Sequence, residues 1–244
     1  MKKGDLRKRE ILNAAEALFC QKGYEQTSIQ DILDVLNTSK GSFYHHFVSK
    51  EALLEGICQK RAEQIYQTAL SSVNEQLSAA DNLNQLLSGM IPFRDEKLVF
   101  LLMLLPIFSL PEGRIVKICY CDALARLFTP AVSEWLRRGH ESGELYCTDP
   151  DIAAGLILSL VNRLWVQVCE MIIQAEGNGT EPDLSAILRL TETYRLSIGQ
   201  IVSLPYGYVK MIDLPSLRLL CEQIHNHWSC KKTYNKEKNR RTNP

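Results

Sequence analysis

The sequence lacks an excess of charge of either sign. Its 244 residues contain 28 Lys and Arg against 28 Asp and Glu, so the formal net charge at pH 7 is zero. Residues 1–60 are net +1, residues 61–229 are net −6 and residues 230–244 are net +5. This distribution excludes a polycation that binds nucleic acid through bulk charge. Binding of a polyanion would have to depend on individually placed residues, and on a dimer that presents two copies of them.

The chain also lacks a long apolar run. The most apolar stretch, residues 98–110, is too short to span a bilayer and contains Pro106, so we expect a buried helix there. Residues 2–10 are charged and show no export signal, and the eight cysteines are scattered. We therefore expect reduced thiols that fill cores, and a cytoplasmic protein without a membrane partner.

Motifs of enzymes are missing as well. The chain has no nucleophile elbow, no metalloprotease motif and no phosphate-binding loop, so we expect no catalytic residues. Four residues near the C-terminus are of metal-ligand types: Cys221, His225, His227 and Cys230. On a helix the first two share one face and the last two lie roughly opposite, which does not suit one tetrahedral site. We expect no metal and no cofactor.

The apolar periodicity is helical throughout, with no strand pattern and no internal repeat, so the predicted fold class is all-α. Pro130 should kink or divide the helix that contains it. The predicted helices cover residues 5–22, 29–36, 40–47, 49–77, 83–89, 96–109, 113–139, 152–174, 183–204 and 214–228.

Residues 24–54 are the most informative part of the chain. Ser28 and Asp31 have the spacing of a capping box at the start of one short helix. Asn37 is a turn residue that tolerates a left-handed backbone, and Ser39 offers a second N-cap. The pattern favours a helix-turn-helix, although an ordinary helical hairpin with a solvated face gives the same spacing.

The second of these helices has two faces. Phe43 and Phe47 fall on one stripe and can anchor in a core. Gly41 weakens the helix, which suits a close approach of phosphate or base to the backbone. Lys40, Tyr44, His46 and Lys50 can donate hydrogen bonds to phosphates, and Ser42 and His45 are short enough to probe base edges.

The stretch SKGSFYHHFVSKEALL is similar to the recognition-helix signature of TetR/AcrR-type transcriptional regulators. Matching pairs precede it: Ala14–Ala15, Leu18–Phe19, Gly23–Tyr24, Thr27–Ser28 and Asp31–Ile32. The resemblance is specific over residues 7–56. It implies a three-helix head whose third helix enters the major groove. The implied DNA contacts are Thr27, Ser28, Ser39, Lys40, Gly41, Ser42, Tyr44, His45, His46 and Lys50. This chain departs from the usual Ala-Gly-Val before Ser-Lys-Gly, since it has Leu36-Asn37-Thr38.

The same resemblance implies three parts, with a DNA-binding head over residues 1–48, a helical ligand-binding and dimerisation body over 49–229 and a basic, disordered tail over 230–244. In the family two body helices, here 152–174 and 183–204, form a four-helix bundle with their copies in a homodimer. Continuous apolarity along the first of them favours a second partner. The alternative is packing within the monomer.

The family also implies a ligand cavity within the body, for which an ordinary core is the alternative. Arg163 stands mid-helix among apolar residues, where a buried guanidinium would need an anionic ligand group or an acid across the dimer. The candidate lining is Phe93, Phe100, Met103, Leu104, Phe108, Tyr120, Leu124, Phe128, Arg163, Trp165 and Gln167.

Together these expectations describe a homodimeric repressor on a palindromic double-stranded operator, released by a small-molecule effector. The helix from Ser49 would join head to body, so a switching signal would have to arrive there. The alternative is a helical DNA-binding protein regulated by a protein partner without a small ligand. It is motivated by the segment after Pro205, which could cap the body or bind that partner.

Overall fold

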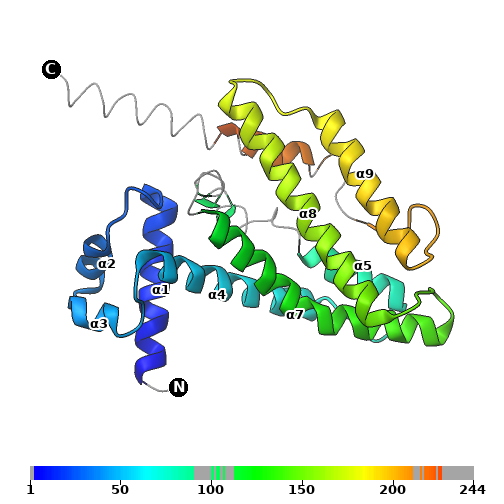
Figure 1. The fold of residues 1–244 in the computed structure, drawn as a ribbon, viewed down its shortest axis with the longest axis horizontal. Helices are drawn as coiled ribbons and strands as arrows, with labels where there is room; N and C mark the ends of the chain where they lie inside the picture. Colours follow the sequence, from blue (N-terminus) through cyan, green and yellow to red (C-terminus); the bar gives the residue numbers. More distant parts are fainter. Residues whose placement is uncertain are drawn as a thin grey trace.

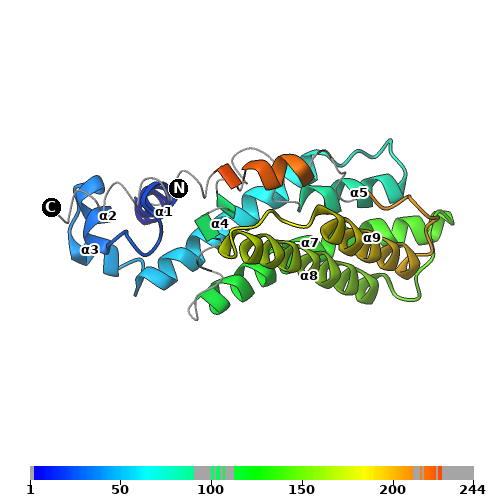
Figure 2. The same ribbon diagram turned by 90° about the horizontal axis from the view of Figure 1, so that it is seen from above.

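In the computed structural model the chain forms a small head and a larger body, and α4 runs from one into the other (Figures 1 and 2). Every regular element among the described residues is a helix, which confirms the all-α prediction. The structure describes residues 3–90, 100–101, 103–104, 107, 113–210, 215, 217–223 and 225–226.

The labelled helices are those of Figure 1. They are α1 (Lys3–Lys22), α2 (Ile29–Leu36), α3 (Lys40–Tyr44), α4 (Lys50–Ser71), α5 (Ala79–Gly89), α7 (Gly113–Ser142), α8 (Pro150–Gly177) and α9 (Leu184–Ile201).

The predicted caps fix the first helices of the head. α1 ends at Gly23, whose φ of +89° lies in the region that favours glycine. Ser28 Oγ accepts a hydrogen bond from the Asp31 amide at 3.1 Å, and the Asp31 carboxylate accepts one from the Ser28 amide at 2.7 Å. This is the expected capping box of α2. Asn37 closes α2 in the left-handed conformation, φ 45°, so it does replace the turn glycine.

The helix α3 is shorter than the predicted 40–47. Ser39 is its N-cap as expected, but the helix ends at Tyr44 and the chain continues as a turn. The His46 amide donates to the Phe43 carbonyl three residues earlier, which tightens the backbone beyond an α-helix. The Phe47 amide still donates to the same carbonyl, so both aromatic anchors remain buried on one side.

The helix α4 ends at Ser71, several residues before the predicted Leu77. The reason is a pair of hydrogen bonds that the periodicity does not show. The Asn74 amide donates to Asn82 Oδ1 at 2.9 Å, and Asn82 Nδ2 donates back to the Asn74 carbonyl at 2.8 Å. Asn82 is fully buried, so these bonds hold the chain in a turn, and Ser78 then caps an α5 longer than predicted.

The long body helices lie close to their predicted ranges. α7 continues through Pro130, so of the two predicted effects of this proline, a kink or a division of the helix, the division does not occur. Pro150 opens α8, where it lacks only an amide that has no helical partner. Asp149 Oδ1 accepts hydrogen bonds from the next free amides, and Asp183 caps α9 in the same way. α8 is long and apolar enough to cross a membrane by length and composition, and half of its most apolar window is buried.

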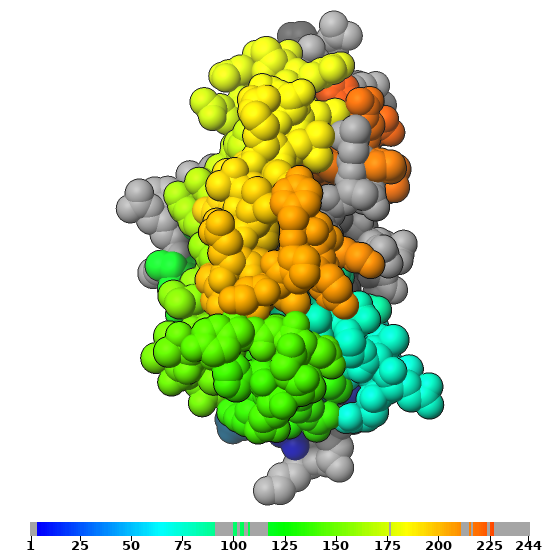
Figure 3. Space-filling view, turned by 90° about the vertical axis from the view of Figure 1, so that its right-hand side faces the viewer, coloured from blue at the N-terminus to red at the C-terminus, as the bar shows by residue number. Residues whose placement is uncertain are grey.

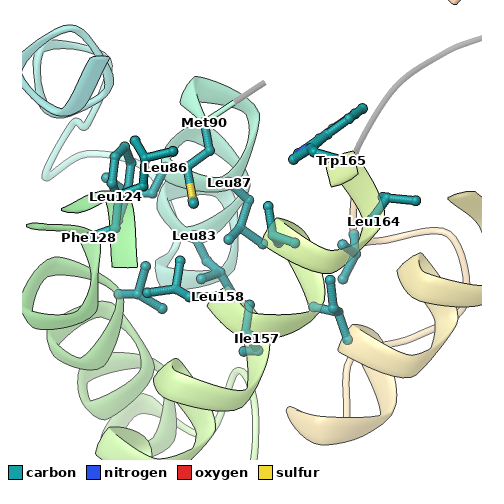
Figure 4. Packing of buried hydrophobic residues seen from close by; sticks show 14 of the residues in the cluster. Leu83, Leu86, Leu87, Met90, Leu124, Phe128, Ile157, Leu158, Leu164 and Trp165 are labelled. Carbon is teal, nitrogen blue, oxygen red and sulfur yellow. The ribbon is translucent and has the colours of Figure 1, made fainter. Parts of the chain in front are cut away.

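The buried residues form two clusters. The body cluster joins α5, α7 and α8 through side chains that include Leu83, Leu87, Phe128 and Leu158 (Figure 4). The described residues Leu217, Leu220 and Cys221 belong to it, so this part of the segment after Pro205 packs against the body. The head cluster contains residues of α1, α2, α3 and α4. It also includes four residues between α5 and α7: Phe100, Met103, Leu104 and Ile107.

Candidate nucleic-acid interface

α3 lies on the side of the head that is turned away from the body (Figure 1), and Lys40, Gly41 and Tyr44 on it are exposed. Phe43 is fully buried beneath them, and its ring meets the edge of Tyr44 at 5.3 Å between centroids. Tyr44 itself is 52% exposed. The short helix is thus anchored through one aromatic side chain and presents the next to solvent.

The predicted DNA contacts divide by exposure. Thr27 is fully buried and its hydroxyl donates to the Gly23 carbonyl at 2.8 Å, so its prediction as a contact is wrong. Its hydroxyl instead fixes the loop between α1 and α2. Ser42, His46 and Lys50 are partly exposed. The exposed members are Ser28, Ser39, Lys40, Gly41, Tyr44 and His45.

Lys50 opens α4 and its ammonium lies on an aromatic surface. Its Nζ is 4.1 Å from the centre of the Tyr24 ring and 5.9 Å from that of Phe19. Burial lowers the pKa of Lys50, although the charges of neighbouring carboxylates oppose this. The ammonium is therefore partly desolvated before any phosphate approaches.

His45 and His46 form an edge-to-face pair with ring centroids 4.9 Å apart. Burial lowers the pKa of His46, and the nearby charges of His45, Lys8 and Arg7 lower it further. The first turns of α1 thus bring two cations beside the end of α3. A phosphate at this position would meet several donors, and its negative charge would oppose the lowering of the His46 pKa.

Two acidic residues of the head, Asp31 and Glu51, are hydrogen-bonded to local donors. The Ser28 hydroxyl and amide, together with Lys22 at 3.0 Å, hold the pKa of Asp31 well below its usual range. The pKa of Glu51 is lowered by hydrogen bonds from its own amide, from Ser49 and from the Tyr24 hydroxyl. Both carboxylates stay ionised, but local donors compensate part of their charge.

A buried ion cluster connects the head to α4, and the sequence analysis missed it. Glu16 on α1 is 5% exposed, accepts from Lys60 at 2.6 Å and is also ion-paired with Arg61. The Arg61 guanidinium lies over the Phe100 ring, 5.5 Å from its centre. An acid within the apolar stripe of α1, next to Ala15, was the available signal.

The described apolar residues of the predicted pocket are divided between the two hydrophobic clusters. Phe93 and Phe108 lie outside the described residues. Phe100, Met103 and Leu104 belong to the head cluster, whereas Leu124, Phe128 and Trp165 belong to the body cluster. Figure 4 shows Leu124 and Phe128 beside Leu86 of α5, with Trp165 away from them. Tyr120 packs against both clusters and contacts Phe100 edge to face at 5.9 Å.

The two polar members of that set differ from each other. Gln167 is partly buried and accepts a hydrogen bond from the Tyr194 hydroxyl at 2.6 Å. Arg163 is exposed on α8, so its expected burial within the body is wrong. The apolar neighbours along the sequence are buried, but the guanidinium lies on the opposite side of the helix.

Of the four residues of metal-ligand type, the structure describes two. Cys221 is buried in the body cluster and His225 is exposed, while His227 and Cys230 lie outside the described residues. Across the described ranges no group of three or more His, Cys, Asp or Glu residues is placed to hold a metal ion.

Residues 11–57, which contain this interface, match the family described as bacterial regulatory proteins, tetR family. This N-terminal segment therefore belongs to the TetR family. YerO of Bacillus subtilis, described as an HTH-type transcriptional regulator, is 28% identical over 197 residues, 75% of this chain and 62% of YerO. The repressor KstR2 of Rhodococcus jostii is 35% identical over 60 residues, 25% of this chain and 29% of KstR2. The chain therefore matches less than two thirds of either relative, and both are transcriptional regulators rather than enzymes.

Solved structures show the same fold. A TetR-family structure from Mesorhizobium loti is 19% identical, with a TM-score of 0.56 over 83% of this chain and 99% of that one. A transcriptional regulator from Saccharomonospora viridis, solved in complex with choline, is 21% identical, with a TM-score of 0.51 over 80% and 96%. At these identities the likeness concerns the fold alone.

Proposed function

We propose that the protein is a homodimeric transcriptional repressor that binds a palindromic operator through α3 and leaves it when a small molecule binds the body. The observation that carries DNA binding is the polar face of α3, exposed at Lys40, Tyr44 and His45 above the buried Phe43. It lies in the segment that matches the family. KstR2 is named a repressor, which supports that direction of control.

The dimer is supported by an exposed stripe on α8. Ile152 is 64% exposed and Leu156 is 52% exposed, and Ser159 and Arg163 continue the same face at helical spacing. Leu196 on α9 is exposed as well. A half-buried apolar helix of this length requires a cover, and we assign a second copy of the chain to it. Two heads could then reach successive major grooves, about 34–36 Å apart.

Arg163 takes a new role under this proposal. Because it is exposed on the α8 stripe, it would face the second copy and pair there with an acid, one of the two roles considered from the sequence. The other role, contact with an anionic ligand inside the body, has lost its support.

We propose that the effector binds beside the junction of the head and body clusters. Tyr120 touches both, so a molecule bound beside it would act on the body and on the residues packed against the head. The choline bound to the Saccharomonospora relative supports a small organic molecule as effector. It must bind the DNA-incompetent shape more tightly, and each tenfold preference is about 1.4 kcal/mol. Regulation by a protein partner has less support, since Leu217 and Leu220 pack into the body.

DNA binding is tested with duplexes selected from a random pool by the purified protein. The double variant Tyr44→Phe/Lys50→Ala should bind the selected duplex at least tenfold more weakly, because each change removes a donor to phosphate. Lys210→Ala, at an exposed lysine of the body, is the matched control and should bind as the unaltered protein does. Undiminished binding by the double variant would contradict the assignment.

The dimer is tested by sedimentation velocity. Leu156→Arg should convert dimer to monomer, since a charge replaces an apolar contact at the centre of the stripe. Ile118→Arg, at an exposed residue of α7 outside the stripe, should remain dimeric. A dimer that survives Leu156→Arg and dissociates with Ile118→Arg would place the interface elsewhere.

A further inference from the structure

Resting on the proposed DNA binding, we propose that Tyr24 is a positioning residue that holds the Lys50 ammonium ready for a DNA phosphate. The two residues come from different elements. Tyr24 follows the end of α1, and Lys50 is the first residue of α4. The Lys50 Nζ nevertheless lies 4.1 Å from the centre of the Tyr24 ring, well within the range of a cation–π contact.

The aromatic ring under the ammonium is packed into the head cluster. The Tyr24 ring is 8% exposed, and it meets the fully buried Phe19 edge to face, with 5.1 Å between centroids and 70° between planes. A lysine side chain otherwise samples many rotamers in water. A fixed aromatic face restricts them, so less freedom remains to be lost when phosphate binds.

The charge of Lys50 is also kept available. Three carboxylates face it, those of Glu25, Glu51 and Asp31, yet within the described part of the chain none lies in ion-pair distance of its ammonium. Asp31 is taken up by Ser28 and Lys22.

Tyr24 contributes to this separation a second time. Its hydroxyl lies 3.4 Å from Glu51 Oε1 and donates to it, so the neighbouring carboxylate has a partner other than Lys50. Glu25 is exposed and acts through solvent, where its charge is screened. Tyr24 thus supports the cation with its ring and occupies the carboxylate beside it with its hydroxyl.

The test is a double-mutant cycle measured by fluorescence anisotropy on the selected duplex. Lys50→Ala should weaken binding and lower the slope of log affinity against log salt by about 0.9 per head, the value for one lost phosphate contact. Tyr24→Leu should weaken binding roughly threefold to fivefold when Lys50 is present. In the Lys50→Ala background it should have no effect, because the cation it positions is gone.

A residue that only stabilises the fold behaves differently. It would weaken binding by the same factor in both backgrounds, and that result would overturn the proposal. Tyr24→Phe keeps the ring and should stay within about twofold of the unaltered protein; a loss as large as with Tyr24→Leu would also overturn it. If Tyr24→Leu does not fold, 3,4,5-trifluorophenylalanine at position 24 keeps the shape and weakens the ring's attraction for a cation.

The fluorinated ring should reduce affinity relative to Tyr24→Phe only when Lys50 is present, and equal affinities would overturn the proposal. The same measurements distinguish failure of the proposed DNA binding from failure of this inference. If the proposed DNA binding fails, Lys50→Ala and Tyr44→Phe would bind the duplex like the unaltered protein, whereas failure of this inference alone leaves the loss with Lys50→Ala intact.

Discussion

Replacement of Glu16 with alanine should destabilise the protein more than any surface change on the same helix. The Glu16 side chain is 7% exposed and joins α1 to α4 through Lys60 and Arg61, whose side chains are 20% and 21% exposed. Removal of the acid leaves two cations near each other in a mostly buried site. Arg61 also lies over Phe100, so its displacement would disturb the head cluster.

The expected loss lies between two limits. Breaking a fully buried ion pair costs about 3–5 kcal/mol, and a surface pair is worth about 0–1 kcal/mol. Because Lys60 and Arg61 retain some contact with water, we expect Glu16→Ala to lower the free energy of unfolding by about 2–4 kcal/mol. For a chain of this size each 1 kcal/mol shifts Tm by about 2–4 °C, so the midpoint should fall by roughly 4–16 °C.

The assay is urea and thermal unfolding followed by circular dichroism. Glu10→Ala is the matched control, since Glu10 pairs with Arg7 at the surface of the same helix, and it should change stability by less than about 1 kcal/mol. Replacing Glu16, Lys60 and Arg61 together with apolar residues should recover part of the loss. Equal effects of Glu16→Ala and Glu10→Ala would refute the importance of the ion cluster.

Three further changes have definite expected outcomes. DNA phosphate should raise the lowered pKa of His46, so binding takes up a proton and operator affinity should increase as pH falls through the ordinary histidine pKa of about 6.5 and below it; a flat profile, or one unchanged in His46→Gln, would refute this. Gly89→Ala should destabilise the body by about 1–3 kcal/mol in urea unfolding, because its Cβ would lie 2.4 Å from that of Ala69; Ser88→Ala next to it should be nearly neutral. Asn37→Ala should cost about 1 kcal/mol at its left-handed position, and Asn37→Gly should be neutral in the same measurement.

The parts of the fold that could be predicted from sequence depend on contacts between near neighbours. Caps such as Ser28, Ser39 and Ser49 act within four residues, so their position in the sequence is enough to locate a helix start. The helix ends that were predicted wrongly depend on partners farther along the sequence. α4 stops early because Asn74 bonds to Asn82, and no periodicity within α4 contains that information.

The residues of the candidate site can be separated in the same way, into those that follow from local spacing and those that depend on the fold. The exposed residues of α3 follow from helical spacing around Phe43, and that part was found. Thr27 was misjudged because its residue type suits both a DNA contact and a buried hydrogen bond to Gly23, and only the fold decides between them. Arg163 was misjudged because a mostly apolar helix can still have one exposed face.

A head with a net charge near zero can bind DNA only if its charges are unequally available. Asp31 is compensated by Ser28 and Lys22, and the buried Glu16 is already paired, so neither opposes phosphate at full strength. Lys40 is exposed, and Lys50 lies on an aromatic ring rather than on a carboxylate. The effective charge at the interface is therefore more positive than the count of residues indicates. Under the proposed mode of binding each head contacts few phosphates, so we expect a shallow salt dependence for one head and twice that slope for the proposed dimer.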